Sequence, residues 1–99
     1  MTDLDYVKSC FPFGKFNKEL YNAIEIETEK LIKKDKKFET FKRGILYNTY
    51  RILKDIMVTD ILGINFYQNT DNIHIQYKCY SCNAGIITKE KIIRLELAY

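Results

Sequence analysis

Three cysteines are the residues of this 99-residue sequence best suited to chemistry. Two residues separate Cys79 from Cys82, a spacing that lets two thiolates bind one tetrahedral zinc ion. Cys10 and His74 could complete the ligand set, although His74 alternates onto the strand face opposite Cys79, and a dimer could instead pool two cysteine pairs. A disulfide from Cys10 to Cys79 or Cys82 is the second interpretation. The third is that Cys79 is a buried thiol and Cys82 a turn residue.

The second and third cysteines lie in the segment YKCYSCNAG, which resembles one knuckle of a zinc ribbon. In that family a strand provides the first thiolate and a tight turn provides the second, so the resemblance implies a zinc site at Cys79 and Cys82. The family has two knuckles where this chain has one, and Asn83 stands at its usual glycine. We find no glycine-rich phosphate loop and no carboxylate spacing typical of acid–base catalysis. We therefore predict a protein that is not an enzyme and has no cofactor, unless zinc binds here.

A basic segment between Lys30 and Arg43 is the second chemical feature. Phe38 and Phe41 are interleaved with its charges, a mixture that can bind the phosphates of a nucleic acid and stack on its bases. The alternative is a solvated helix end, where lysines offset the helix dipole and both phenylalanines turn inward. The candidate nucleic-acid-binding residues are Lys33, Lys34, Lys36, Lys37, Lys42 and Arg43. A net charge of +3 permits such a partner and does not require it.

Hydrophobic periodicity predicts that the longest helix covers residues 41–63. Ile45 and Ile52 belong to a broad apolar stripe that recurs every three or four residues. Thr40 is a suitable N-cap, and Gly63 fits the left-handed position that follows a helix.

A second helix is predicted over residues 17–37, with Asn17 as its N-cap. Residues 1–16 are expected to form no regular element, because Pro12 and Gly14 interrupt them. Their large apolar side chains either pack back on the domain or form a surface for a partner.

Beyond the helices the apolar period changes to two, which is typical of strands. We predict strands over 64–67, 73–80, 86–88 and 93–99, although 88–99 also tolerates helical spacing. The sequence thus predicts an α+β fold in one domain, residues 1–99, with two N-terminal helices packed on a C-terminal antiparallel meander of three or four strands.

The chain as a whole resembles the small, uncharacterised proteins of filamentous viruses that infect hyperthermophilic, acidophilic archaea. The resemblance lies in its length, its three cysteines and its isoleucine-, lysine- and tyrosine-rich text, as in YNTYRILKDI and NIHIQYKCY. It implies a thermostable protein of the host cytoplasm or the virion. Neither a secretory signal nor a membrane span is expected, because charges interrupt every apolar run. Eight tyrosines and six phenylalanines favour a protein partner or self-association, for example a homodimer.

Overall fold

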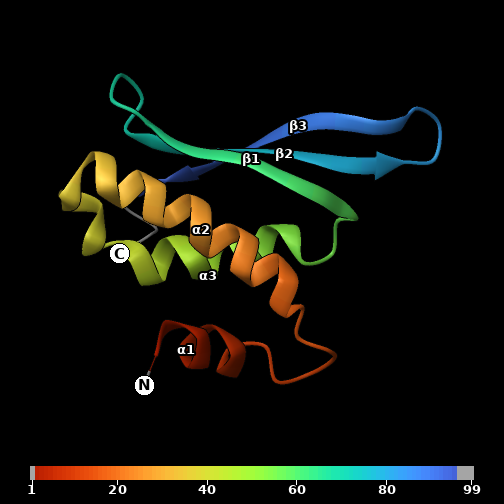
Figure 1. Cartoon of the computed structure of the whole chain (residues 1–99), viewed down its shortest axis with the longest axis horizontal. Helices are drawn as coiled ribbons and strands as arrows, with labels where there is room; N and C mark the ends of the chain where they lie inside the picture. The colour runs from red at the N-terminus through yellow and green to blue at the C-terminus, as the bar shows by residue number, and fades with distance from the viewer. Residues whose placement is uncertain (1, 96–99) are drawn as a thin grey trace.

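The computed structural model describes residues 2–95, which form three helical segments, a short 3-10 turn and one antiparallel sheet. In chain order the elements are α1 (Asp3–Ser9), α2 (Lys18–Lys34), η1 (Lys36–Glu39), α3 (Lys42–Leu53), β1 (Val58–Tyr67), β2 (Asn72–Ser81) and β3 (Gly85–Arg94). The helices lie on one side of the sheet, with α2 and α3 against it and α1 beyond them (Figure 1). The predicted α+β fold is therefore confirmed, with one helix more than expected.

The N-terminal segment contains helix α1, so the prediction that it has no regular element was wrong. Thr2 and Asp5 form a reciprocal capping box, in which each side chain accepts from the other's backbone N–H. Val7 is fully buried and anchors the helix on the core. Pro12 follows after the end of the helix, where a ring that cannot continue a helix is tolerated.

Helix α2 begins where the sequence predicted and ends three residues earlier. The side chain of Asn17 accepts a hydrogen bond from the backbone N–H of Leu20 at 3.0 Å, which confirms it as the N-cap. At the other end Asp35 leaves the helical conformation, and its carboxylate accepts from the N–H of Lys37 at 3.1 Å. The chain thereby turns into η1, which buries Phe38.

Helix α3 ends at Leu53, so the prediction of one helix through Gly63 was wrong. Residues 58–67 are instead the first strand, and Gly63 is buried within it. The run from Val58 to Ile61 is rich in β-branched residues, which pack well on a pleated surface and lose rotamer freedom in a helix. Pairing with β2 further stabilises this segment as a strand. Thr40 is not the cap either, because Phe41 holds that position without a side-chain hydrogen bond.

The sheet has the order β1-β2-β3 with antiparallel neighbours. Ile73, Ile75, Tyr77 and Cys79 point toward the helices, while His74 alternates to the other face as predicted. Strand β1 carries two register shifts, between Val58 and Asp60 and between Ile61 and Gly63. We call the helix-covered face the inner face and the opposite one the outer face.

Strand β3 is one continuous strand through Arg94, so the prediction of two separate strands, 86–88 and 93–99, was wrong, and no helix starts at Thr88. Lys89 is paired with Tyr77, and Lys91 with Ile75, which places both lysines at inner-face positions. They are nevertheless exposed. The end of the predicted last strand, residues 96–99, lies outside the described residues.

Two buried hydroxyl groups in the core have no hydrogen-bond partner within residues 2–95. They belong to Thr49 of α3 and Tyr77 of β2, both fully buried. Burial raises the pKa of the Tyr77 phenol above its usual value, and the neighbouring Cys79 thiol adds to the shift. Within the described residues, no helix is both long and apolar enough to cross a membrane.

Candidate functional site

The predicted basic segment is divided between two surfaces of the protein. Lys42 and Arg43, at the start of α3, face α1, where both contact the carboxylate of Asp3, at 3.6 and 3.0 Å. Lys42 also pairs with Glu29 of α2, and this hydrogen bond raises the pKa of Lys42. These two cations therefore link three helices through ion pairs, and acidic partners offset part of their charge.

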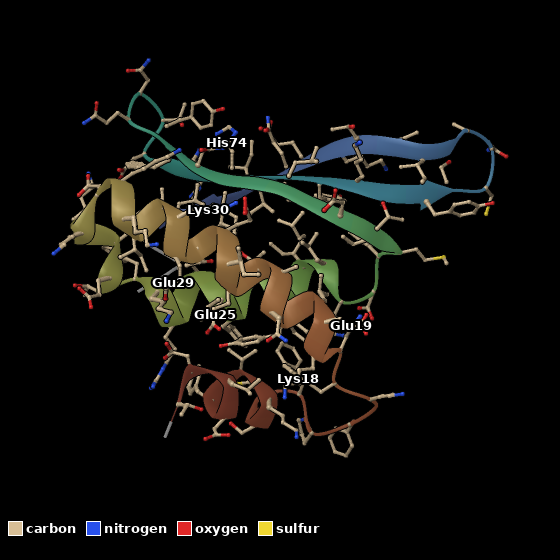
Figure 2. The ribbon with its side chains drawn as sticks, in the orientation of Figure 1. Lys18, Glu19, Glu25, Glu29, Lys30 and His74 are labelled. Carbon is tan, nitrogen blue, oxygen red and sulfur yellow. The ribbon has the colours of Figure 1, made fainter. Side chains whose placement is uncertain are left out.

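A buried tyrosine extends this network between the helices. The Tyr21 hydroxyl donates to the carboxylate of Glu25 at 3.1 Å. Burial, followed by that hydrogen bond, raises the pKa of Tyr21 well above its usual value. In Figure 2, Glu25 and Glu29 lie on the side of α2 that faces α1, whereas Lys30 lies on the side that faces the sheet. Two acidic side chains of α2 thus face α1, whereas Lys30 faces the sheet and pairs with Glu27 at 2.9 Å.

The four other predicted lysines surround the C-terminal end of α2 and η1. They are Lys33, Lys34, Lys36 and Lys37. Lys37 has a loose ion pair with Asp35 at 3.7 Å, and both side chains are half exposed. Lys33, Lys34 and Lys36 form no ion pair with another residue of the described chain. This part of the basic segment therefore carries uncompensated positive charge.

A cleft of about 680 Å³ opens beside these lysines, between the end of α2 and the turn that joins β1 to β2. Lys34 and Lys37 line one wall, and Phe66, Tyr67 and His74 contribute rings to the other. Phe38 also lines the cleft, and it contacts Phe66 edge-on with ring centroids 4.9 Å apart. Of the two predicted aromatics, Phe38 is fully buried and Phe41 is half-buried, so both turn inward as the alternative reading expected.

His74 forms one side of this cleft through contacts on the outer face. Its ring packs on Tyr67 with centroids 4.1 Å apart, and its Nδ1 lies 3.1 Å from a carboxylate oxygen of Glu90. The labelled side chain is found at the end of the sheet near the β1–β2 turn (Figure 2). Its partners come from β1 and β3, which explains why reasoning on β2 alone did not find them.

The three predicted cysteines are free thiols. Cys79 is buried on the inner face, whereas Cys82 is exposed in the β2–β3 turn and Cys10 is exposed at the end of α1. Between residues 2 and 95 no three histidine, cysteine or acidic side chains gather as a metal site would require. Zinc binding at Cys79 and Cys82 stays a prediction of the sequence.

None of the described helices covers the outer face of the sheet (Figure 1), and this face carries exposed apolar side chains. Tyr80 and Ile86 are cross-strand partners at the β2–β3 turn, and Ile92 is paired with His74 nearer the other end. Ile86 is 61% exposed and Ile92 is 54% exposed. The alternation of residues in β2 predicts that Tyr80 lies on the outer face. The contribution of β3 to this face was not predicted, because the sequence pattern divided β3 into two strands.

Comparison with known proteins adds no functional assignment to this geometry. Neither a protein-family model, nor a curated protein sequence, nor a solved structure matches the chain. The fold and its surfaces define a small α+β protein with an open sheet face and a basic, aromatic cleft.

Proposed function

We propose that the chain is a non-enzymatic protein that acts through protein interaction or assembly, and that a second copy binds the outer face of its sheet. The observation that supports this proposal is the exposure of Tyr80, Ile86 and Ile92 on a face that none of the described helices covers. Tyr80 and Ile86 form an exposed apolar pair at one end of this face, and Ile92 lies nearer the other end. Several exposed apolar side chains on one face favour a protein contact.

The composition of the outer face fits such a contact. Tyr67 and Tyr80 combine a large apolar ring with a polar end, which suits an interface that is dry at its centre and wet at its rim. Lys78, Glu90 and Arg94 occupy the same face at other positions, so its charges are mixed. Two copies related by a two-fold axis could therefore pair opposite charges around their isoleucines.

Light scattering over a range of protein concentrations tests the proposal. The wild-type chain is expected to be a dimer, and Ile86→Lys or Ile92→Lys is expected to be a monomer with an unchanged circular dichroism spectrum. The matched control is Ile26→Lys on α2, because Ile26 is 57% exposed and the change adds the same charge away from the sheet. A wild-type chain that is monomeric at every concentration, or an equal effect of Ile26→Lys, would contradict the proposal.

A further inference from the structure

The cleft at the end of α2 continues into a second hollow along the edge of the sheet. This hollow has a volume of about 350 Å³ and shares Leu31, Lys34 and Asn65 with the cleft. One wall is the C-terminal half of α2 with η1, and the other is the edge of β1, which pairs only with β2 in the described sheet. Together the two hollows form a groove, which we call the α2–β1 groove.

Positive charge exceeds negative charge along the α2–β1 groove. Four lysines line it, against the carboxylates of Glu27 and Asp35. Glu27 is paired with Lys30 at 2.9 Å. The lysines are Lys30, Lys33, Lys34 and Lys37. An anionic chain that follows this groove therefore meets cations at several successive points.

Aromatic rings occupy the end of the groove that Lys34 and Lys37 line. The Lys37 ammonium lies 4.7 Å from the centroid of the Phe66 ring and 5.2 Å from that of Phe38. Tyr67 is 44% exposed and rests on His74, which holds its ring in place. A planar base could stack on the exposed ring of Tyr67, while the Lys37 ammonium turns from the phenylalanine rings to a phosphate.

Amide groups complete the set of contacts. Asn65, Gln68 and Asn69 line the same cleft beside Tyr67, and each side chain offers both a donor and an acceptor. Base edges require both kinds of partner. Two lysines, one exposed ring and three amides thus lie at one end of the groove.

From this arrangement we propose that the α2–β1 groove binds nucleotides, with a base stacked at Tyr67 and phosphates at Lys34 and Lys37, as a single strand of nucleic acid presents them. The proposal goes beyond self-association and uses a different part of the surface. An acidic peptide is the competing ligand, since it could pair with the edge of β1. It would account for the lysines but not for the rings, and the register shift between Ile61 and Gly63 interrupts the edge of β1 where the groove begins.

Fluorescence anisotropy with a labelled 12-nucleotide single strand of DNA or RNA tests the proposal. Binding is expected at low salt and should weaken as salt rises. Lys34→Gln combined with Lys37→Gln removes two phosphate contacts, so the salt slope should fall by about 1.4, at about 0.7 per contact. The matched control is Lys15→Gln combined with Lys18→Gln, which changes the charge equally at exposed lysines away from the groove, with Lys18 at the opposite end of α2 (Figure 2).

A ring variant separates stacking from charge. Tyr67→Thr keeps a strand-forming residue and removes the ring, so affinity should fall at least about fivefold with an unchanged salt slope. Competition by adenosine monophosphate at the same affinity as the strand would identify the ligand as a free nucleotide, and weaker competition would identify a strand. Absence of binding at low salt, an equal effect of the control pair, or equal competition by polyglutamate would overturn the proposal.

Discussion

Replacing Thr49 by valine should stabilise the protein, although it removes a polar group from the core. The Thr49 hydroxyl is fully buried in α3 and has no hydrogen-bond partner within residues 2–95. A buried hydroxyl without a partner costs about 1–3 kcal/mol, and the added methyl group contributes about 0.8 kcal/mol through burial. Because the surroundings relax only partly, we expect the free energy of unfolding to rise by about 1–2 kcal/mol.

A second threonine provides a matched control for this substitution. Thr28 is also fully buried in a helix, but its hydroxyl donates to the carbonyl oxygen of Ile24 at 2.8 Å. Thr28→Val removes a hydrogen bond worth about 1 kcal/mol and adds a buried methyl group. The free energy of unfolding of this variant should stay unchanged or fall by up to about 1 kcal/mol. The two variants have the same chemistry and burial, and only the hydrogen bond differs.

Urea unfolding followed by circular dichroism measures the difference. With a urea dependence of about 1–3 kcal/mol per molar, a gain of 1 kcal/mol raises the midpoint by roughly 0.3–1 M. The thermal midpoint should rise by about 4–8 °C for each kcal/mol in a domain of this size. A midpoint for Thr49→Val at or below that of Thr28→Val would refute the reasoning that an unpartnered hydroxyl weakens this core.

Three further predictions follow from the pKa shifts, the β2–β3 turn and the cysteines. The raised pKa of Tyr21 stabilises the fold below the usual tyrosine pKa and loses that effect as pH rises past it, so the urea midpoint should fall above about pH 10 and fall less in Tyr21→Phe. Gly85 has φ +74° with open space around it, so Gly85→Ala should cost about 1–2 kcal/mol in thermal unfolding through backbone strain alone. In a thiol-labelling time course Cys10 and Cys82 should react at once and Cys79 only on unfolding, whereas three equal rates would contradict the inner-face position of Cys79.

Strand β2 was predictable because one face of it is buried and the other is not. Ile73, Ile75 and Tyr77 alternate with polar residues, so only one face of the strand can be buried. The local pattern and the tertiary packing therefore favour the same orientation of the strand. Asn17 was found for a similar reason, since an N-cap depends on a contact three residues away. Features determined by near neighbours are readable from the sequence alone.

The helix predicted over residues 41–63 failed because a distant segment decides its second half. Ile56 continues the helical stripe of α3, yet Val58 pairs with Cys79 and the backbone oxygen of Met57 accepts from Tyr80. Those partners lie far along the chain, and a β-branched run is compatible with their strand. Periodicity measures which faces are apolar and cannot measure the free energy of pairing with β2.

The basic segment shows the same limit for the candidate site. Its lysines were found by composition, but the sequence could not show that Lys42 and Arg43 belong to Asp3 in α1. Phe66 and Tyr67 belong to the strand predicted over residues 64–67, and yet only the fold brings them to the cleft that Lys37 lines. The sequence contained a signal for helix α1, because Thr2 and Asp5 have the spacing of a capping box. Pro12 and Gly14 nevertheless led to the prediction of an irregular segment.

The two lysines at inner-face positions of β3 have a consequence for how copies of the chain can meet. A ten-residue edge strand offers unpaired backbone groups, and an edge that is flat and apolar on both faces invites copies to add without end into fibrils. Lys89 and Lys91 place like charges on that edge, so two copies that paired β3 with β3 would oppose their own ammonium groups. Growth by edge addition through β3 is thereby discouraged.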